Sequence, residues 1–151
     1  MDPRPPTPDH RLGPHPLTEE GIAALLDRYA FGDACLRRVA LDQEYGPRAA
    51  RGRLAGLVID ARVVGEDLRW EPVYLELHDV RRFRIDESVG FSWVLYDPPR
   101  FTRFDGLLQV DLCAERFGSL RPESAAEVFE GSELVFEAAG GTWSALHPWE
   151  G

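Results

Sequence analysis

Two stretches of alternating apolar and polar residues, separated by a short turn signal, constrain the fold of this chain more than any other feature. Every second side chain is apolar from residue 53 to 64, and the alternation returns over 69–78. Gly65, Glu66 and Asp67 lie between the two stretches. Because successive side chains of a strand point to opposite faces of a sheet, this pattern is typical of half-buried strands. The sequence therefore predicts a long β-hairpin.

A helix is predicted before this hairpin, over about residues 19–30. Thr18 is a typical N-cap, and two glutamates follow it in the first turn, where the helix dipole favours negative charge. Gly32 is the expected stop. The apolar face has the i, i+3, i+4, i+7 spacing of a helix and consists of Ile22, Leu25, Leu26 and Tyr29.

Further stretches with a period of two extend the β pattern. A first strand is expected after Gly32, with Cys35, Val39 and Leu41 on one face. The alternation slips at Asp79, which predicts a β-bulge near that residue. The other predicted elements are a strand over 91–96, a strand over 108–112 after the Asp105–Gly106 turn, a single helical turn within 122–129, and a last hairpin that joins 134–136 to 142–144 through Gly140–Gly141.

Together these elements predict a mainly β (α+β) fold. We expect an antiparallel β-sheet or sandwich of six to seven strands with one N-terminal helix. Residues 1–17 hold half of the 12 prolines, so this segment is expected to be a flexible, extended N-terminal tail. Residues 18–151 are expected to form a single domain, since 151 residues suit one hydrophobic core.

Charge and composition exclude several classes of function. All 17 basic residues are arginine, so the chain has no lysine for a Walker A loop or a Schiff base. The net charge of -9 disfavours binding to nucleic acid, and no apolar stretch approaches the roughly 18 residues of a membrane span. The proline-rich start is unlike a signal peptide, so we expect a cytoplasmic protein with Cys35 and Cys113 as reduced, buried thiols. The absence of lysine and asparagine indicates the codon usage of a GC-rich bacterial genome.

The order of the apolar segments resembles a known class of small bacterial domains. The step Phe31-Gly32-Asp33 precedes the first strand, a long strand follows at 54–64, and its hairpin partner bends near Val80 and Phe83. The sequence DGLLQVDL then runs over 105–112. Over residues 25–138 this order resembles the β-rich immunity-type domains of polymorphic toxin systems, which often carry an aromatic-x-Asp step; Gly32 stands where the aromatic-His-Asp version has histidine. The resemblance implies a protein that binds and neutralises a toxin.

The C-terminal part of the chain is strongly acidic. Residues 122–151 hold six glutamates and no arginine. Such a negative surface attracts a basic protein and speeds the encounter. We therefore expect a non-enzymatic, immunity-protein-like domain that has no metal or cofactor and neutralises a basic toxin domain through this acidic surface. The predicted partner-binding residues are Glu127, Glu130, Glu133, Glu137 and Trp149.

Two alternatives remain open. In the first, a small-molecule-binding or enzymatic β domain uses a pocket lined by four polar residues of the predicted strands, Asp60, Glu76, His78 and Asp111. In the second, the chain is an oligomerising structural module. An uncovered edge strand, for which the last hairpin is the candidate, would then pair with a second copy to give a homodimer.

Overall fold

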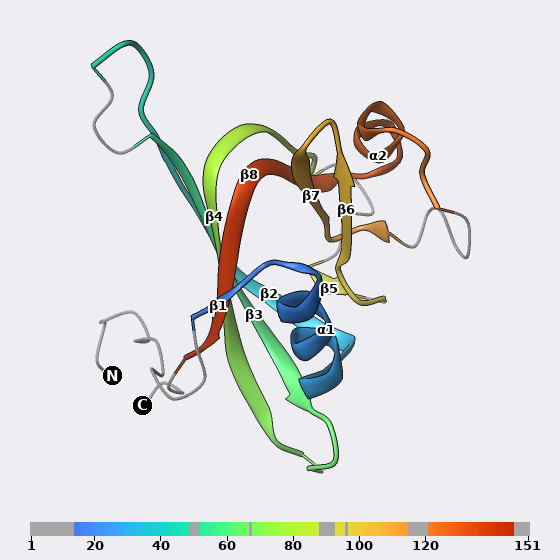
Figure 1. Cartoon of the computed structure of the whole chain (residues 1–151). Coiled ribbons are helices and arrows are strands. Elements are labelled where there is room, and N and C mark those ends of the chain that lie inside the picture. Colours follow the sequence, from blue (N-terminus) through green and yellow to red (C-terminus); the bar gives the residue numbers. More distant parts are fainter. Residues whose placement is uncertain are drawn as a thin grey trace.

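The described part of the chain folds into one curled antiparallel sheet that carries two helices. The computed structural model describes residues 14–48, 52–66, 68–87, 93–95, 97–114 and 121–146. Within them the strand order is β5-β2-β3-β4-β8-β7-β6, with β1 also paired to β8. The mainly β, antiparallel prediction is confirmed (Figure 1). The elements are β1 (His15–Pro16), α1 (Glu19–Arg28), β2 (Tyr29–Gln43), β3 (Arg53–Val63), β4 (Trp70–Ile85), β5 (Val94–Leu95), β6 (Arg100–Phe104), β7 (Leu107–Asp111), α2 (Ala125–Gly131) and β8 (Leu134–Ala145).

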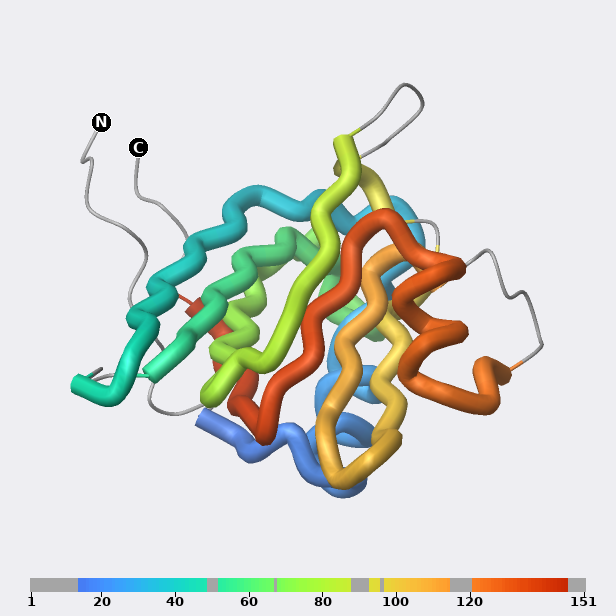
Figure 2. Tube along the Cα trace, turned by 90° about the horizontal axis from the view of Figure 1, so that it is seen from above, coloured from blue at the N-terminus to red at the C-terminus, as the bar shows by residue number. Residues whose placement is uncertain are grey.

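The core lies between the concave face of the sheet and α1. Figures 1 and 2 show the strands curling so that α1 lies within the curl. Leu25 of α1 is fully buried, as are Leu57 and Leu75 of the central strands. The Trp143 indole Nε1 donates a hydrogen bond of 2.7 Å to the Gly21 carbonyl oxygen. Burial and this bond together hold α1 against β8.

The predicted hairpin is formed by β3 and β4. Its register runs from Leu54 opposite His78 to Arg62 opposite Trp70. The predicted bulge is also present, because Asp79 has a φ of 53° and the pairing of β4 with β8 shifts between Val80 and Arg82. The apolar face of the hairpin is buried as expected and consists of Ala55, Leu57, Ile59, Ala61, Val63, Val73, Leu75 and Leu77.

The helix begins where the sequence predicts and ends two residues earlier. Thr18 is the N-cap, and its hydroxyl oxygen accepts a hydrogen bond of 3.2 Å from the Gly21 N–H. Tyr29 already has extended backbone angles and begins β2, so Gly32 lies inside a strand and does not cap the helix. The extended backbone lets the buried Tyr29 ring pack on Phe31 while its hydroxyl reaches β4.

The inward face of β2 differs from the predicted one. Asp33 has a φ of 64°, and the pairing with β3 shifts between Ala30 and Cys35. This irregularity resets the alternation, so Leu36 is buried while Cys35 is only half-buried and Leu41 is exposed. Cys113, on the other hand, is buried as expected, and both cysteines are free thiols.

The predicted last hairpin is wrong, because residues 134–145 form one continuous strand, β8. Neither Gly140 nor Gly141 has the positive φ that a tight hairpin turn needs. Gly141 instead lies opposite Leu77, where an added Cβ would overlap the backbone oxygen of Glu76. Since β8 lies between β4 and β7, it is not an edge strand, and it does not offer the free edge that the oligomerising alternative assigned to it.

The remaining elements lie close to their predicted positions. The Asp105–Gly106 turn joins β7 to β6, a strand that the sequence pattern did not indicate. The predicted helical turn corresponds to α2, which begins after the N-cap Ser124. β5 lies within the predicted strand at 91–96.

The end of the predicted tail lies on the sheet. His15 and Pro16 pair with Trp143 and Thr142 of β8, and the buried Leu17 donates its backbone N–H to the Gly141 carbonyl oxygen at 2.9 Å. Residues 1–13 of the tail lie outside the described residues.

We predict that Gly141→Ala destabilises the fold, whereas Gly140→Ala does not. The new Cβ at 141 meets the backbone of β4, and such overpacking costs about 1–3 kcal/mol. A Cβ at 140 meets nothing within 4 Å, so that change stays within about 1 kcal/mol. Urea unfolding of the two variants measures this difference, and equal losses would contradict the close approach of β8 to β4.

Candidate functional site

Two exposed acidic residues of the C-terminal part, Glu127 and Glu130, lie on α2, and a third, Glu123, directly precedes the N-cap of this helix. The Ser124 hydroxyl oxygen accepts a hydrogen bond of 3.2 Å from the Glu127 N–H, and the Glu127 carboxylate accepts one of 2.6 Å from the Glu123 N–H. These two bonds resemble a capping box, which fixes the start of a helix. Glu123, Glu127 and Glu130 are exposed, and α2 contains no basic residue. We call these three residues the acidic α2 face.

Two arginines of β4 fasten α2 to the sheet. The Arg82 guanidinium lies 3.9 Å from the centroid of the Phe129 ring, and Arg84 donates a hydrogen bond of 2.9 Å to the Phe129 carbonyl oxygen. Ala125 and Val128 are the buried residues of the helix. The arginines therefore meet α2 through Phe129, while its glutamates remain in solvent.

The other predicted partner-binding residues are placed differently. Glu137 is 6% exposed, and its carboxylate accepts hydrogen bonds from Arg82 at 3.1 Å and from Gln109 at 2.9 Å. Its charge is thus compensated inside the protein and is not part of the acidic surface. Glu133 is half-buried, and Trp149 lies outside the described residues.

The four residues of the proposed small-molecule pocket do not converge. The Glu76 carboxylate lies 2.7 Å from the His78 Nε2, but Asp60 forms an ion pair of 3.2 Å with Arg37. Asp60 is four residues along β3 from the residue opposite Glu76, a separation of about 13 Å. Asp111 is buried on β7, where its carboxylate accepts a hydrogen bond of 2.6 Å from the Ser132 hydroxyl.

A row of three polar side chains instead follows the outer face of β4. The Tyr74 hydroxyl donates a hydrogen bond of 3.0 Å to Glu76, whose other oxygen contacts His78. Burial of the ring and the adjacent Glu76 carboxylate raise the pKa of Tyr74 to about 12. Glu76 and His78 are 40% and 44% exposed. Because these groups are open to solvent, the row is suited to surface contacts more than to enclosing a reactant.

Burial and an ion pair have opposite effects on the pKa of Asp60. Burial raises the pKa of Asp60, and the Arg37 guanidinium opposes part of this shift.

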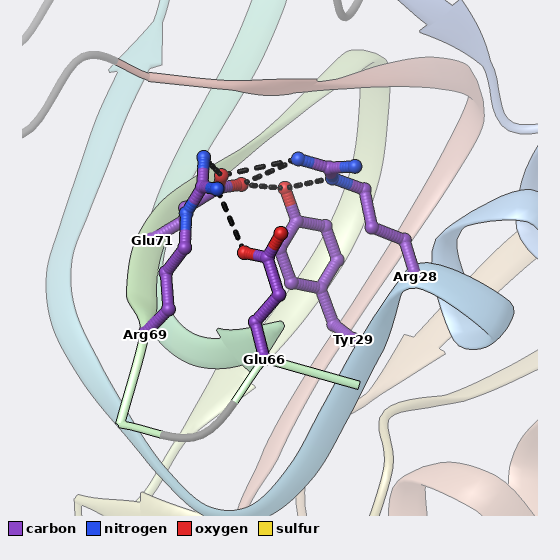
Figure 3. Close-up of polar contacts among 5 residues, drawn as sticks. All are labelled: Arg28, Tyr29, Glu66, Arg69 and Glu71. Carbon is purple, nitrogen blue, oxygen red and sulfur yellow. Dashed lines mark hydrogen bonds and ion pairs between the residues drawn. The ribbon is translucent and has the colours of Figure 1, made fainter. Parts of the chain in front are cut away.

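A second polar cluster, shown in Figure 3, joins the end of α1 to the β3–β4 turn. Glu71 is 6% exposed and accepts hydrogen bonds of 2.7 Å from the Tyr29 hydroxyl, 3.1 Å from Arg28 and 2.9 Å from Arg69. Arg69 also contacts Glu66 at 2.7 Å. Burial and the bond to Glu71 raise the pKa of Tyr29. The sequence did not indicate this cluster, since its members come from α1, β2, β4 and the turn between β3 and β4.

Other site types find no support among the described residues. No group of three His, Cys, Asp or Glu side chains within them is placed to hold a metal ion. Neither of the two described helices is long and apolar enough to cross a membrane. Comparison with known proteins found no matching family model, no matching curated protein and no matching solved structure.

We predict that Glu71→Gln lowers the free energy of unfolding by about 2 kcal/mol or more, because two guanidinium groups lose a buried counter-charge. Glu66→Gln is the matched control. It removes only an exposed partner of Arg69, so we expect a loss of about 0–1 kcal/mol. Urea denaturation at neutral pH compares the two variants, and equal losses would show that Glu71 has no special role.

We also predict that Tyr74 makes the free energy of unfolding depend on pH. Its pKa is higher in the folded chain than the ordinary value of 10.0, so its contribution to stability is complete below pH 10 and is lost as pH rises toward 12. In Tyr74→Phe the free energy of unfolding should fall less steeply over this interval, although Tyr29 still contributes. Urea midpoints at pH 9 and pH 11.5 measure the slope, and an unchanged slope would contradict the raised pKa.

Proposed function

We propose that this chain is a non-enzymatic protein-binding domain of the immunity type, which neutralises a basic toxin domain through the acidic α2 face. The observation that carries the proposal is the position of Glu127 and Glu130. Both are exposed on a helix without basic residues. Arg82 and Arg84 hold this helix to the sheet through Phe129. The resemblance of residues 25–138 to immunity-type domains points to the same class of partner.

The physical argument rests on long-range attraction. The net charge of -9 and the exposed glutamates draw a basic protein toward this helix before contact. Because the carboxylates are solvated, their effect falls mainly on the association rate and on the choice of partner. Glu137 adds little, since Arg82 already compensates it. The acidic surface is therefore smaller than the sequence alone predicts.

We predict that Glu127→Gln combined with Glu130→Gln slows association with a basic toxin domain encoded beside this gene. At low salt the association rate should fall on the order of tenfold, and its dependence on salt should weaken, because steering charges are lost. Stopped-flow binding at 50 and 300 mM NaCl measures both quantities, and relief of growth inhibition by co-expression tests neutralisation.

Glu19→Gln combined with Glu20→Gln is the matched control, because it removes two exposed charges from the other helix. Association of this control should remain close to that of the unaltered chain. The proposal fails if no basic toxin domain binds, or if both double variants slow association equally.

A further inference from the structure

β2 runs along one rim of the sheet, and within the described residues most of its outer edge borders no other strand (Figure 2). β5 pairs with β2 only at Ala34 and Cys35, whereas β2 continues to Gln43. Residues 37–43 therefore have a strand of the described chain on one side only, which is β3. An edge of this kind is able to pair with a further strand.

The outer edge of β2 presents its backbone groups in a regular order. The Glu44 N–H donates inward, to the Gly52 carbonyl oxygen at 3.3 Å. The pairing with β3 is regular in this stretch, and the backbone groups of successive residues point alternately to the two sides of an antiparallel strand. Those of Val39 and Leu41 therefore point outward, whereas those of Ala40 point inward to β3. The outward groups are the donors and acceptors that an added antiparallel strand needs.

The charges of this stretch are complementary to themselves. Residues 37–44 read RRVALDQE, so two arginines precede the exposed Ala40 and two acidic residues follow it. When a second copy pairs antiparallel about a two-fold axis at Ala40, Arg38 lies directly opposite Asp42 of the partner subunit. Arg38 and Asp42 are both exposed, and they lie on one face because four residues of regular strand separate them. Opposite charges therefore meet twice across the axis.

The remaining charges do not prevent this pairing. The Arg37 guanidinium lies 3.2 Å from the Asp60 carboxylate, so its charge is compensated within the chain. The net charge of -9 makes two copies repel one another at a distance. At physiological salt this repulsion is screened beyond about 8 Å, so the charges along the edge decide whether two strands pair.

The other face of the same stretch supplies apolar contacts. Val39 and Leu41 lie opposite the buried Leu57 and Ala55, so they point to the concave side of the sheet. Leu41 is 39% exposed. A hollow of about 620 Å³ lies beside them, and its apolar lining residues are Leu36, Val39, Leu41, Ile85 and Trp93. In the two-fold pairing, Leu41 of the partner subunit lies opposite Val39 and faces this hollow.

The second edge strand, β6, lacks this complementarity. It has five residues, which include Arg100 and Arg103 but no acidic residue. The Arg103 guanidinium donates a hydrogen bond of 2.6 Å to the Leu17 carbonyl oxygen, which ties this edge to the segment before α1. Two copies of β6 would bring basic side chains together without counter-charges, and charge of one sign protects an edge from pairing. β2 has no such protection.

We propose that the outer edge of β2 is a dimer interface, where it pairs antiparallel with β2 of a second copy of this chain and Ala40 lies on the two-fold axis. Two short strands make a small contact, so the dimer dissociates on dilution. Figures 1 and 2 place this part of β2 on the opposite side of the molecule from α2. The dimer therefore leaves the acidic α2 face open and does not depend on the function proposed for it.

The first test reverses the charges that face each other across the axis. Arg38→Glu alone places like charges opposite each other twice, and so does Asp42→Arg alone. We expect each variant to raise the dissociation constant of the dimer about tenfold or more, and the double variant to restore it to within about threefold. Sedimentation equilibrium of the full chain at 150 mM NaCl, from 1 μM to 1 mM protein, measures these constants.

Arg62→Glu is the matched control for the change of charge. Arg62 is exposed on β3 and lies opposite Trp70, away from residues 37–44. This variant should dimerise as the unaltered chain does.

The second test locates the axis by a disulfide. Ala40→Cys is combined with Cys35→Ser, which removes the half-buried thiol of the same strand. In the proposed pairing, position 40 forms a non-hydrogen-bonded pair with itself, with the two Cα atoms about 4.5 Å apart, and a disulfide bridges that separation. Mild oxidation should therefore link two chains at position 40, which peptide mass spectrometry identifies.

Tyr45→Cys in the same background is the control for random oxidation. Tyr45 is 72% exposed but lies five residues from the axis, so few chains should be linked through it. Equal linkage at positions 40 and 45 would overturn the proposal. A chain that stays monomeric at 1 mM would also overturn it, and so would single charge variants that dimerise normally or a double variant that does not recover.

Discussion

Burial of the apolar face shared by β3, β4 and β8 is the constraint on which the rest of this structure depends. Each fully buried leucine or isoleucine of that face contributes about 1.5–3 kcal/mol, but only if the concave side is closed to water. α1 closes it, with Leu25 fully buried and Trp143 bonded to the Gly21 carbonyl. The early end of α1 at Arg28 follows from the same requirement, because Tyr29 must be extended to pack in the core and reach Glu71.

Local patterns predicted the parts of the fold that neighbouring residues determine. The alternation in β3 and β4, the N-cap at Thr18 and the bulge at Asp79 can all be read from a few consecutive residues. The structural role of the glycine pair in β8 could not be predicted from neighbouring residues, because glycine occurs both in tight turns and where two backbones approach closely. Only the position of Glu76 on the adjacent strand distinguishes the two.

The candidate site was predictable to a similar extent. The acidic character of the C-terminal part was evident from the sequence, and Glu127 and Glu130 are indeed exposed. The burial of Glu137 depends on Arg82, which is 55 residues away and which no local pattern links to it. Because the chain has no lysine, its ion pairs with arginine rely on a planar group that stays charged at every physiological pH.

The central position of β8 has a consequence for the order of folding. The β2–β3–β4 strands and the β6–β7 hairpin each pair with neighbours along the chain, whereas β8 follows all of them and joins the two groups. Pairings such as Val73 with Ala145 span long distances in sequence, and contacts of this kind form slowly. During synthesis one edge of β4 and one edge of β7 therefore stay unpaired until β8, which follows the other described strands, has left the ribosome and pairs with both.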